Sequence, residues 1–149
     1  MALEERLTAD LREAAKKGDA VRRSVIRLVI AGKKNVEKAK GVPLDNSGII
    51  DVIAKEVKQH RESIAEFSKG NRQDLVAKEE AELAVLLEYL PKQMSHEEIV
   101  EAARGIIEQV GARGPGDKGK VMAQLMPQIK GKADGREVSD MVSELLSEL

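Results

Sequence analysis

Residues 49–67 read IIDVIAKEVKQHRESIAEF, and this stretch decides the fold class. Its apolar residues recur three and four positions apart, which places them on one face of an α-helix. The same spacing continues through most of the chain, and the β-branched residues follow it without the period-two alternation of a strand. The sequence therefore predicts an all-α protein.

Turn-forming residues divide this pattern into seven helices. Breaks at residues 18–19, 40–43 and 70–71 separate four helices in the first part of the chain, and loops at 111–116 and 130–135 separate three in the second. Pro127 is expected to end or kink the sixth helix, because it lacks the backbone amide. The residues expected to cap helices are Asp19, one of Asp45, Asn46 or Ser47, then Asn71, Ser95 and Asp117.

A proline after the fourth helix marks a domain boundary. Pro91 disfavours helix at Leu90, so the fourth helix should end near Leu90. A new helix then opens at Ser95, which has Glu98 at the spacing of a capping box. We predict an N-terminal four-helix domain over residues 1–91 and a small three-helix C-terminal domain over residues 92–149.

The composition excludes several classes of protein. The 149 residues include no cysteine, so disulfides, thiolate metal sites and a cysteine nucleophile are ruled out. The two histidines leave little material for a histidine-based metal or acid–base site. Aromatic residues make up 1%, which argues against RNA modules that stack bases on aromatic side chains. The first residues are acidic, and no apolar run approaches the roughly 18 residues of a membrane span. We therefore expect a cytoplasmic protein with no membrane partner.

Residues 16–40 carry nine basic and two acidic residues, although the whole chain has a net charge of −1. Arg23, Arg27, Lys34 and Lys38 fall within about 60° on a helical wheel and span some 20 Å. Such a row is typical of a surface that follows a phosphate backbone. The alternative is an ordinary solvated face, with or without pairing to acids of a neighbouring helix. The buried stripe of the same helix is predicted as Val21, Val25, Leu28, Val29, Gly32 and Val36.

A second basic region covers residues 113–136, where six basic residues face two acidic ones. Two of its lysines lie at an expected helix start, where free amides and the helix dipole attract anions. Glycines in both loops allow a ligand to approach the backbone closely. The alternative is internal pairing with the acidic last helix. The basic residues are Arg113, Lys118, Lys120, Lys130, Lys132 and Arg136.

Several motifs resemble catalytic or nucleotide sites only formally. Residues 114–120 satisfy both G-x-G-x-x-G and G-x-x-x-x-G-K, but each motif needs a preceding strand, and Val121 replaces the magnesium-binding Ser or Thr. His96 lacks a second histidine one turn on, so it forms no zinc motif. His60 is expected to be exposed. We predict no catalytic residue, no metal and no cofactor. Met122, Met126 and Met141 are expected to fill the core.

Several strings together resemble the YqeY-like family over essentially the whole chain. They are KEVKQHRESI (55–64), GNRQDL (70–75), EYLPKQMS (88–95), GKVM (119–122), MP (126–127) and KGKADG (130–135). That family is similar to the tail domain of the B subunit of the tRNA-dependent amidotransferase. The tail is helical, binds tRNA and holds no catalytic residues. The resemblance implies a non-catalytic accessory module of translation that binds tRNA, so any carbon–nitrogen ligase activity would belong to other domains.

The resemblance also implies which residues contact the RNA. Gly119, Lys120, Gly131, Lys132 and Ala133 lie where the family and the tail share a Gly/Lys pattern, and are assigned phosphate contact and close backbone approach. Ala123 and Lys118 depart from the pattern: Ala123 is expected to restrict helix packing, and Lys118 to add charge. The full candidate set is Lys118, Gly119, Lys120, Lys130, Gly131, Lys132, Ala133, Arg136, Arg23, Arg27, Lys34 and Lys38.

A second hypothesis is a protein-interaction adaptor. It would dock on an aminoacyl-tRNA synthetase or amidotransferase complex through an apolar groove between the domains. Met94, Met122 and Met126 motivate this hypothesis.

Overall fold

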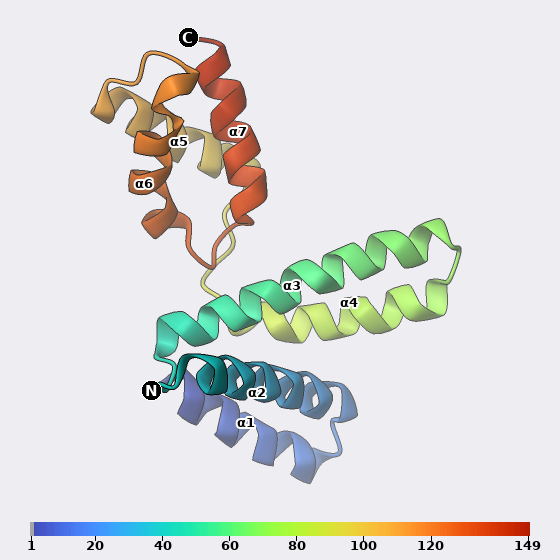
Figure 1. Cartoon of the computed structure of the whole chain (residues 1–149). Helices are drawn as coiled ribbons and strands as arrows, with labels where there is room; N and C mark the ends of the chain where they lie inside the picture. Colours follow the sequence, from blue (N-terminus) through green and yellow to red (C-terminus); the bar gives the residue numbers. More distant parts are fainter. Residues whose placement is uncertain (1) are drawn as a thin grey trace. The chain divides into compact units, whose positions relative to one another are not determined.

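The computed structural model describes residues 2–149, and these residues form seven α-helices, one short 3-10 helix and no strand (Figure 1). The all-α prediction is confirmed. The helices are α1 (Leu3–Lys17), α2 (Ala20–Lys40), α3 (Asn46–Lys69), α4 (Gln73–Leu87), α5 (His96–Val110), α6 (Lys118–Ile129) and α7 (Gly135–Ser147), with the 3-10 helix η1 at Pro115–Asp117.

Three of the expected helix caps are present. The Asp19 carboxylate accepts a hydrogen bond from the Arg22 amide at 3.0 Å, and the Asp45 carboxylate accepts one from the Gly48 amide at 2.8 Å. Ser95 begins α5 with a reciprocal capping box. These side chains satisfy amides that have no partner inside the helix, which explains why α2, α3 and α5 begin where they do.

Two other cap predictions are wrong. Asn71 adopts the left-handed conformation (φ 56°) after the end of α3, and Arg72 precedes α4 without a side-chain cap. The Asp117 carboxylate accepts from the Arg113 amide at 2.9 Å, so it binds the preceding loop instead of capping α6. Asn tolerates a left-handed turn, and Asp can bond to either side of a helix start.

The two prolines have different effects on their helices. Helix α4 ends at Leu87, near Leu90 as predicted, and residues 88–90 form a turn in which amides bond to carbonyls three residues back. Pro127 lies inside α6, which continues to Ile129. The proline therefore does not end the helix. Ile129 is fully buried, which stabilises the last turn despite the missing bond to the Ala123 carbonyl.

The contacts divide the chain into two compact units, one up to Leu90 and one from Pro91 to Leu149. In the first unit, α1 pairs with α2 and α3 pairs with α4, and α2 contacts both α3 and α4 (Figure 1). Its core includes Leu7, Ile26, Ile53 and Leu86, all almost completely buried. Burial of each such side chain stabilises the fold by about 1.5–3 kcal/mol.

The second unit packs α5, α6 and α7 against one another around its own core. Fully buried residues come from all three helices, among them Ala103, Val121, Leu125 and Leu146. The methionine predictions are confirmed in part. Met141 is buried and Met122 packs against the core, but Met126 is exposed.

Candidate nucleic-acid interface

The buried stripe predicted for helix α2 is confirmed in part: Val25 and Val29 are buried and Val36 packs against the core. Val21 and Leu28 are 40% and 41% exposed, although both were assigned to the buried stripe. Ile26 and Lys33 are buried instead. Apolar residues cover a wide arc of this helix, so the wheel alone does not determine which part of the arc faces inward.

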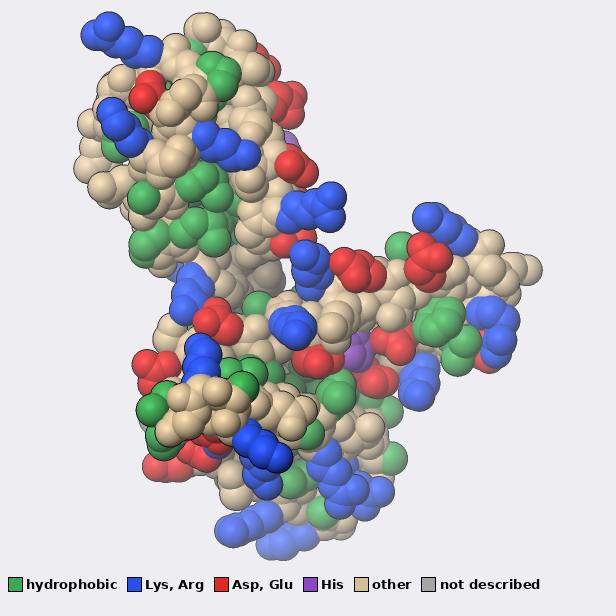
Figure 2. Space-filling view, viewed as in Figure 1, with side chains coloured by type: hydrophobic (Ala, Val, Ile, Leu, Met, Phe, Trp, Pro, Cys, Tyr) green, Lys and Arg blue, Asp and Glu red, His purple; other side chains and the backbone are tan. Residues whose placement is uncertain are grey.

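The predicted row of Arg23, Arg27, Lys34 and Lys38, here called the α2 row, lies on the outer side of the helix. Arg23 is half-buried and the other three are exposed. None of the four forms an ion pair with a carboxylate of residues 2–149. Figure 2 shows Lys and Arg side chains gathered over α1 and α2. The row is thus a largely unpaired basic surface. Lys34 still interacts with an acid of its own helix: after the Leu44 amide and Lys33, its charge also lowers the pKa of Glu37.

Other basic residues of the same region stabilise the fold. Arg22 bridges Asp19 at 3.5 Å and Glu88 at 2.7 Å, and Lys17 pairs with Glu13 at 3.3 Å. The Glu88 hydrogen bond raises the pKa of Arg22 above its usual range, against the lowering effect of burial. Because Arg22 and Lys17 already pair with acids of the protein, the basic surface that a polyanion could contact consists of the α2 row and its exposed neighbours.

Lys33 is the most buried of these basic residues, with 7% of its surface exposed. Its Nζ lies 2.8 Å from Oε1 of Glu4 and 2.9 Å from Oε1 of Glu37. The hydrogen bond to Glu4, then that to Glu37, raises the pKa of Lys33. The Leu44 amide, then Lys33, lowers the pKa of Glu37. This network joins α1, α2 and the loop before α3.

Helix α6 separates the second basic region into two groups. Lys118 and Lys120 lie at its first turn, and Lys130 and Lys132 follow its last turn. Twelve residues of helical rise place the two groups about 18 Å apart. The structure therefore does not bring the predicted Gly/Lys positions into one pocket. Arg136 is exposed in the first turn of α7, near the second group in sequence.

The loop after α6 holds its lysines on a fixed backbone. Gly131 adopts φ 74°, a left-handed conformation that favours glycine. The Lys132 and Ala133 amides both donate to the Ile129 carbonyl, at 2.8 and 3.2 Å. The Gly131 carbonyl accepts from Gln93 Nε2 at 2.7 Å. These two amides are therefore satisfied inside the protein, and the side chain of Lys132 is the remaining cationic group of this pair of residues.

The start of α6 is less favourable for an anion than the sequence indicated. Asp117 lies directly before the helix, and its Oδ1 is 3.8 Å from Nζ of Lys120. A carboxylate at this end already occupies the positive end of the helix dipole. A Cβ on Gly119 would meet open space, so packing within the described residues does not require a glycine there. Ala123 is exposed, so the expectation that it restricts helix packing is wrong.

His60 was expected to be exposed, but it is 6% exposed between α3 and α4. Its Nδ1 donates to the Glu56 carbonyl at 2.8 Å, because a carbonyl can only accept. Its Nε2 lies 3.5 Å from carboxylate oxygens of both Glu79 and Glu82. Oε2 of Glu82 is buried and has no hydrogen-bond partner among residues 2–149. Glu79 and Glu82 are three residues apart, so they share one face of a helix, and this spacing was the feature of the sequence that could have indicated the cluster.

The nucleotide-like and zinc-like motifs of the sequence lie on helices and loops. Residues 114–120 follow helix α5 and a loop, so no strand precedes them. His96 is exposed at the first position of α5. Within residues 2–149, no group of three or more His, Asp or Glu side chains could hold a metal ion. No helix of this part of the chain is long and apolar enough to cross a membrane.

The family model described as Yqey-like protein matches residues 4–146. The chain belongs to the YqeY-like family. A relative from Pyrenophora tritici-repentis supports this assignment, with 33% identity over 95% of this chain and 79% of its own length. It is named altered inheritance of mitochondria protein 41, mitochondrial.

Relatives with the same printed name occur in Lachancea thermotolerans, at 40% identity over 56% of this chain, and Kluyveromyces lactis, at 42% over 56%. The matches cover 46% and 45% of these two proteins, so they span about half of each relative. The names give a location but no biochemical activity.

These names contradict the expectation of a cytoplasmic protein and point to mitochondria. The expectation rested on the lack of cysteine and on the acidic first residues. Lack of cysteine excludes disulfides, but it does not distinguish the cytoplasm from a mitochondrion. The expectation is therefore corrected.

Proposed function

We propose that this YqeY-like protein is a non-catalytic RNA-binding accessory module whose RNA is tRNA. The observation that carries the proposal is the α2 row: four basic side chains on one side of a helix, none of which forms an ion pair with a carboxylate of residues 2–149. The resemblance to the amidotransferase tail supports tRNA as the class of RNA. Any amidotransferase label would be inherited from that resemblance.

The α2 row suits a phosphate backbone better than base edges. Its residues span about 22 Å along a rigid helix, which fixes the spacing of the charges. Phosphate contacts position a protein on a nucleic acid, and the shape of a folded RNA then supplies the selectivity. With few aromatic residues available, base stacking contributes little to such an interface.

The lysines of α6 and of the loop after it are secondary contacts in this proposal. Because Lys120 and Lys132 lie at opposite ends of α6, they would bind separate phosphates. Lys120→Ala and Lys132→Ala should then weaken binding by independent factors that multiply in the double variant. A single shared phosphate site would instead make the second substitution nearly silent.

The function is tested by filter binding of total tRNA to the full chain at two salt concentrations, with duplex DNA of similar length as control. The proposal expects salt-sensitive binding that prefers tRNA. Binding of DNA with equal affinity, or no binding at low salt, would overturn it.

We also propose that the two compact units are separate domains, residues 1–91 and 92–149. Each has its own buried cluster, which supports this division. Residues 92–149 expressed alone should unfold cooperatively on heating. A fragment without a cooperative transition would contradict the division.

A further inference from the structure

A groove runs along the C-terminal unit between α5 and α7. Its two adjoining hollows have volumes of about 620 Å³ each and share Arg104, Leu145 and Glu148, so they are continuous. From His96 to Gly111 the groove follows α5 for 15 residues, which is about 22 Å of helix. That length accommodates four turns of another helix.

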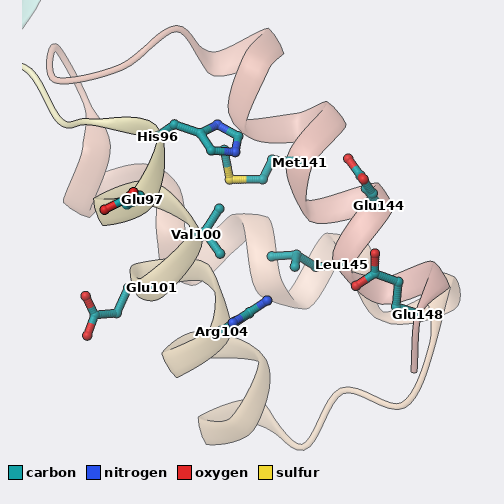
Figure 3. Close-up of a pocket in the computed structure, with 9 residues that line it drawn as sticks. All are labelled: His96, Glu97, Val100, Glu101, Arg104, Met141, Glu144, Leu145 and Glu148. Atoms are coloured by element: carbon teal, nitrogen blue, oxygen red, sulfur yellow. The ribbon is translucent and has the colours of Figure 1, made fainter.

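The floor of the groove combines apolar side chains with Arg104, which lines both hollows. Val100 extends from α5, and Met141 and Leu145 extend from α7 (Figure 3). Val100 and Leu145 are half-buried, so the core of the unit does not fully cover them. Ile107 and Ala112 continue the apolar surface into the second hollow.

The rim of the groove is acidic. Five glutamates line the two hollows against two arginines. The glutamates are exposed, and none forms an ion pair with a basic side chain of residues 2–149. Figure 2 shows acidic side chains along the edge formed by α7. These glutamates are Glu97, Glu101, Glu108, Glu144 and Glu148.

We propose that this acidic groove binds a basic amphipathic helix of a partner protein. Apolar floor side chains between acidic rims complement a helix with apolar residues at i, i+3, i+4 and i+7 and Lys or Arg beside them. The same rims repel a nucleic acid, so this surface does not duplicate the α2 row. The inference is independent of the proposed RNA binding.

The test uses a fluorescent 18-residue helix of Leu and Lys with one apolar face, and a scrambled peptide of identical composition. Anisotropy is measured with the full chain. The amphipathic peptide should bind at least tenfold more tightly than the scrambled one. Amide NMR shifts should fall on residues 96–112 and 141–149. Equal binding of both peptides, or shifts confined to other surfaces, would overturn the proposal.

Variants separate the groove from general electrostatic attraction. Glu101→Gln, Glu144→Gln and Glu148→Gln together should weaken binding at least fivefold, because all three are exposed rim residues. The matched control is Glu62→Gln, Glu66→Gln and Glu80→Gln, which removes three exposed carboxylates from α3 and α4. An equal loss in the control would overturn the proposal.

A second copy of this chain is the competing occupant. Sedimentation velocity of the free protein tests it. The proposal expects a monomer across the concentration range. A dimer that dissociates when the three rim glutamates are neutralised would assign the groove to self-association and overturn the partner proposal.

Discussion

Lys33 and Glu37 form an ion pair one turn apart on α2, with Nζ 2.9 Å from Oε1, and both side chains also bind outside the helix. Lys33 contacts Glu4 of α1 at 2.8 Å, and Glu37 Oε2 accepts from the Leu44 amide at 2.8 Å. The pair therefore connects the start of α1 and the loop before α3 to one position on α2.

Lys33→Met should destabilise the N-terminal unit by about 1–3 kcal/mol, because it removes the ammonium and leaves two carboxylates without it. The loss is modest because Glu4 is largely exposed, so water partly solvates its carboxylate. Hydrogen exchange of the α2 amides measures the effect. Lys34→Met is the control, since Lys34 is exposed, and it should stay within about 0.5 kcal/mol. Equal effects of both substitutions would contradict the network.

Glu37 should give the protein an acid-sensitive contribution to stability. The Leu44 amide and Lys33 lower its pKa below the ordinary value of 4.5, so the folded state favours the carboxylate. The contribution is complete above about pH 5 and is lost as the pH falls through the folded-state pKa. Unfolding of wild type and Glu37→Gln from pH 7 to pH 3 measures it. The two curves should converge at acid pH, whereas a constant separation would contradict this role.

Tyr89 is the only tyrosine, so its titration can be read directly from ultraviolet absorbance. Burial, then its hydrogen bond to Asp10 at 2.5 Å, raises the pKa of Tyr89 to about 12, while Arg22 acts in the opposite direction. Its contribution to stability is complete below pH 10 and is lost as the pH rises toward 12. A titration midpoint near 10 in the folded protein would be inconsistent with this environment.

Glu82→Gln should leave stability unchanged or raise it by up to about 1 kcal/mol at pH 7. Three glutamates surround His60, and one Glu82 oxygen is buried without a partner among residues 2–149, so the substitution removes a poorly solvated charge. Thermal unfolding compares it with Glu80→Gln, an exposed neighbour on the same helix. A loss of more than 1 kcal/mol in the Glu82 variant alone would show that the cluster depends on that charge.

Local signals allowed the helices and most of their boundaries to be predicted from the sequence. Asp19 and Ser95 bond to amides within three residues, so their roles are encoded in the neighbouring positions. Asp117 shows the limit of such signals. Its carboxylate could accept from the first amides of α6 or from the preceding loop, and in the structure it accepts from the Arg113 amide.

Features that depend on packing between helices could not be predicted in the same way. Leu28 was assigned to the core and is exposed, because the orientation of α2 depends on α3 and α4. His60 was assigned to the surface and is buried, because its partners Glu79 and Glu82 come from another helix. The α2 row was predicted correctly as a largely exposed row, since all four side chains share one side of one helix.

The central claim is that the α2 row binds RNA phosphates, and the salt dependence of tRNA binding tests it most directly. The four phosphate contacts of the α2 row contribute about −3 to the slope of log affinity against log salt, and the contacts of Lys120 and Lys132 add to it. The double variant Arg27→Ala with Lys34→Ala should bind tRNA more weakly, and the magnitude of its slope should fall by about 1.5. The control is Lys58→Ala with Lys78→Ala, since these lysines are exposed on α3 and α4. The control should leave the slope nearly unchanged. A slope equal to that of wild type in the α2 variant would contradict the account.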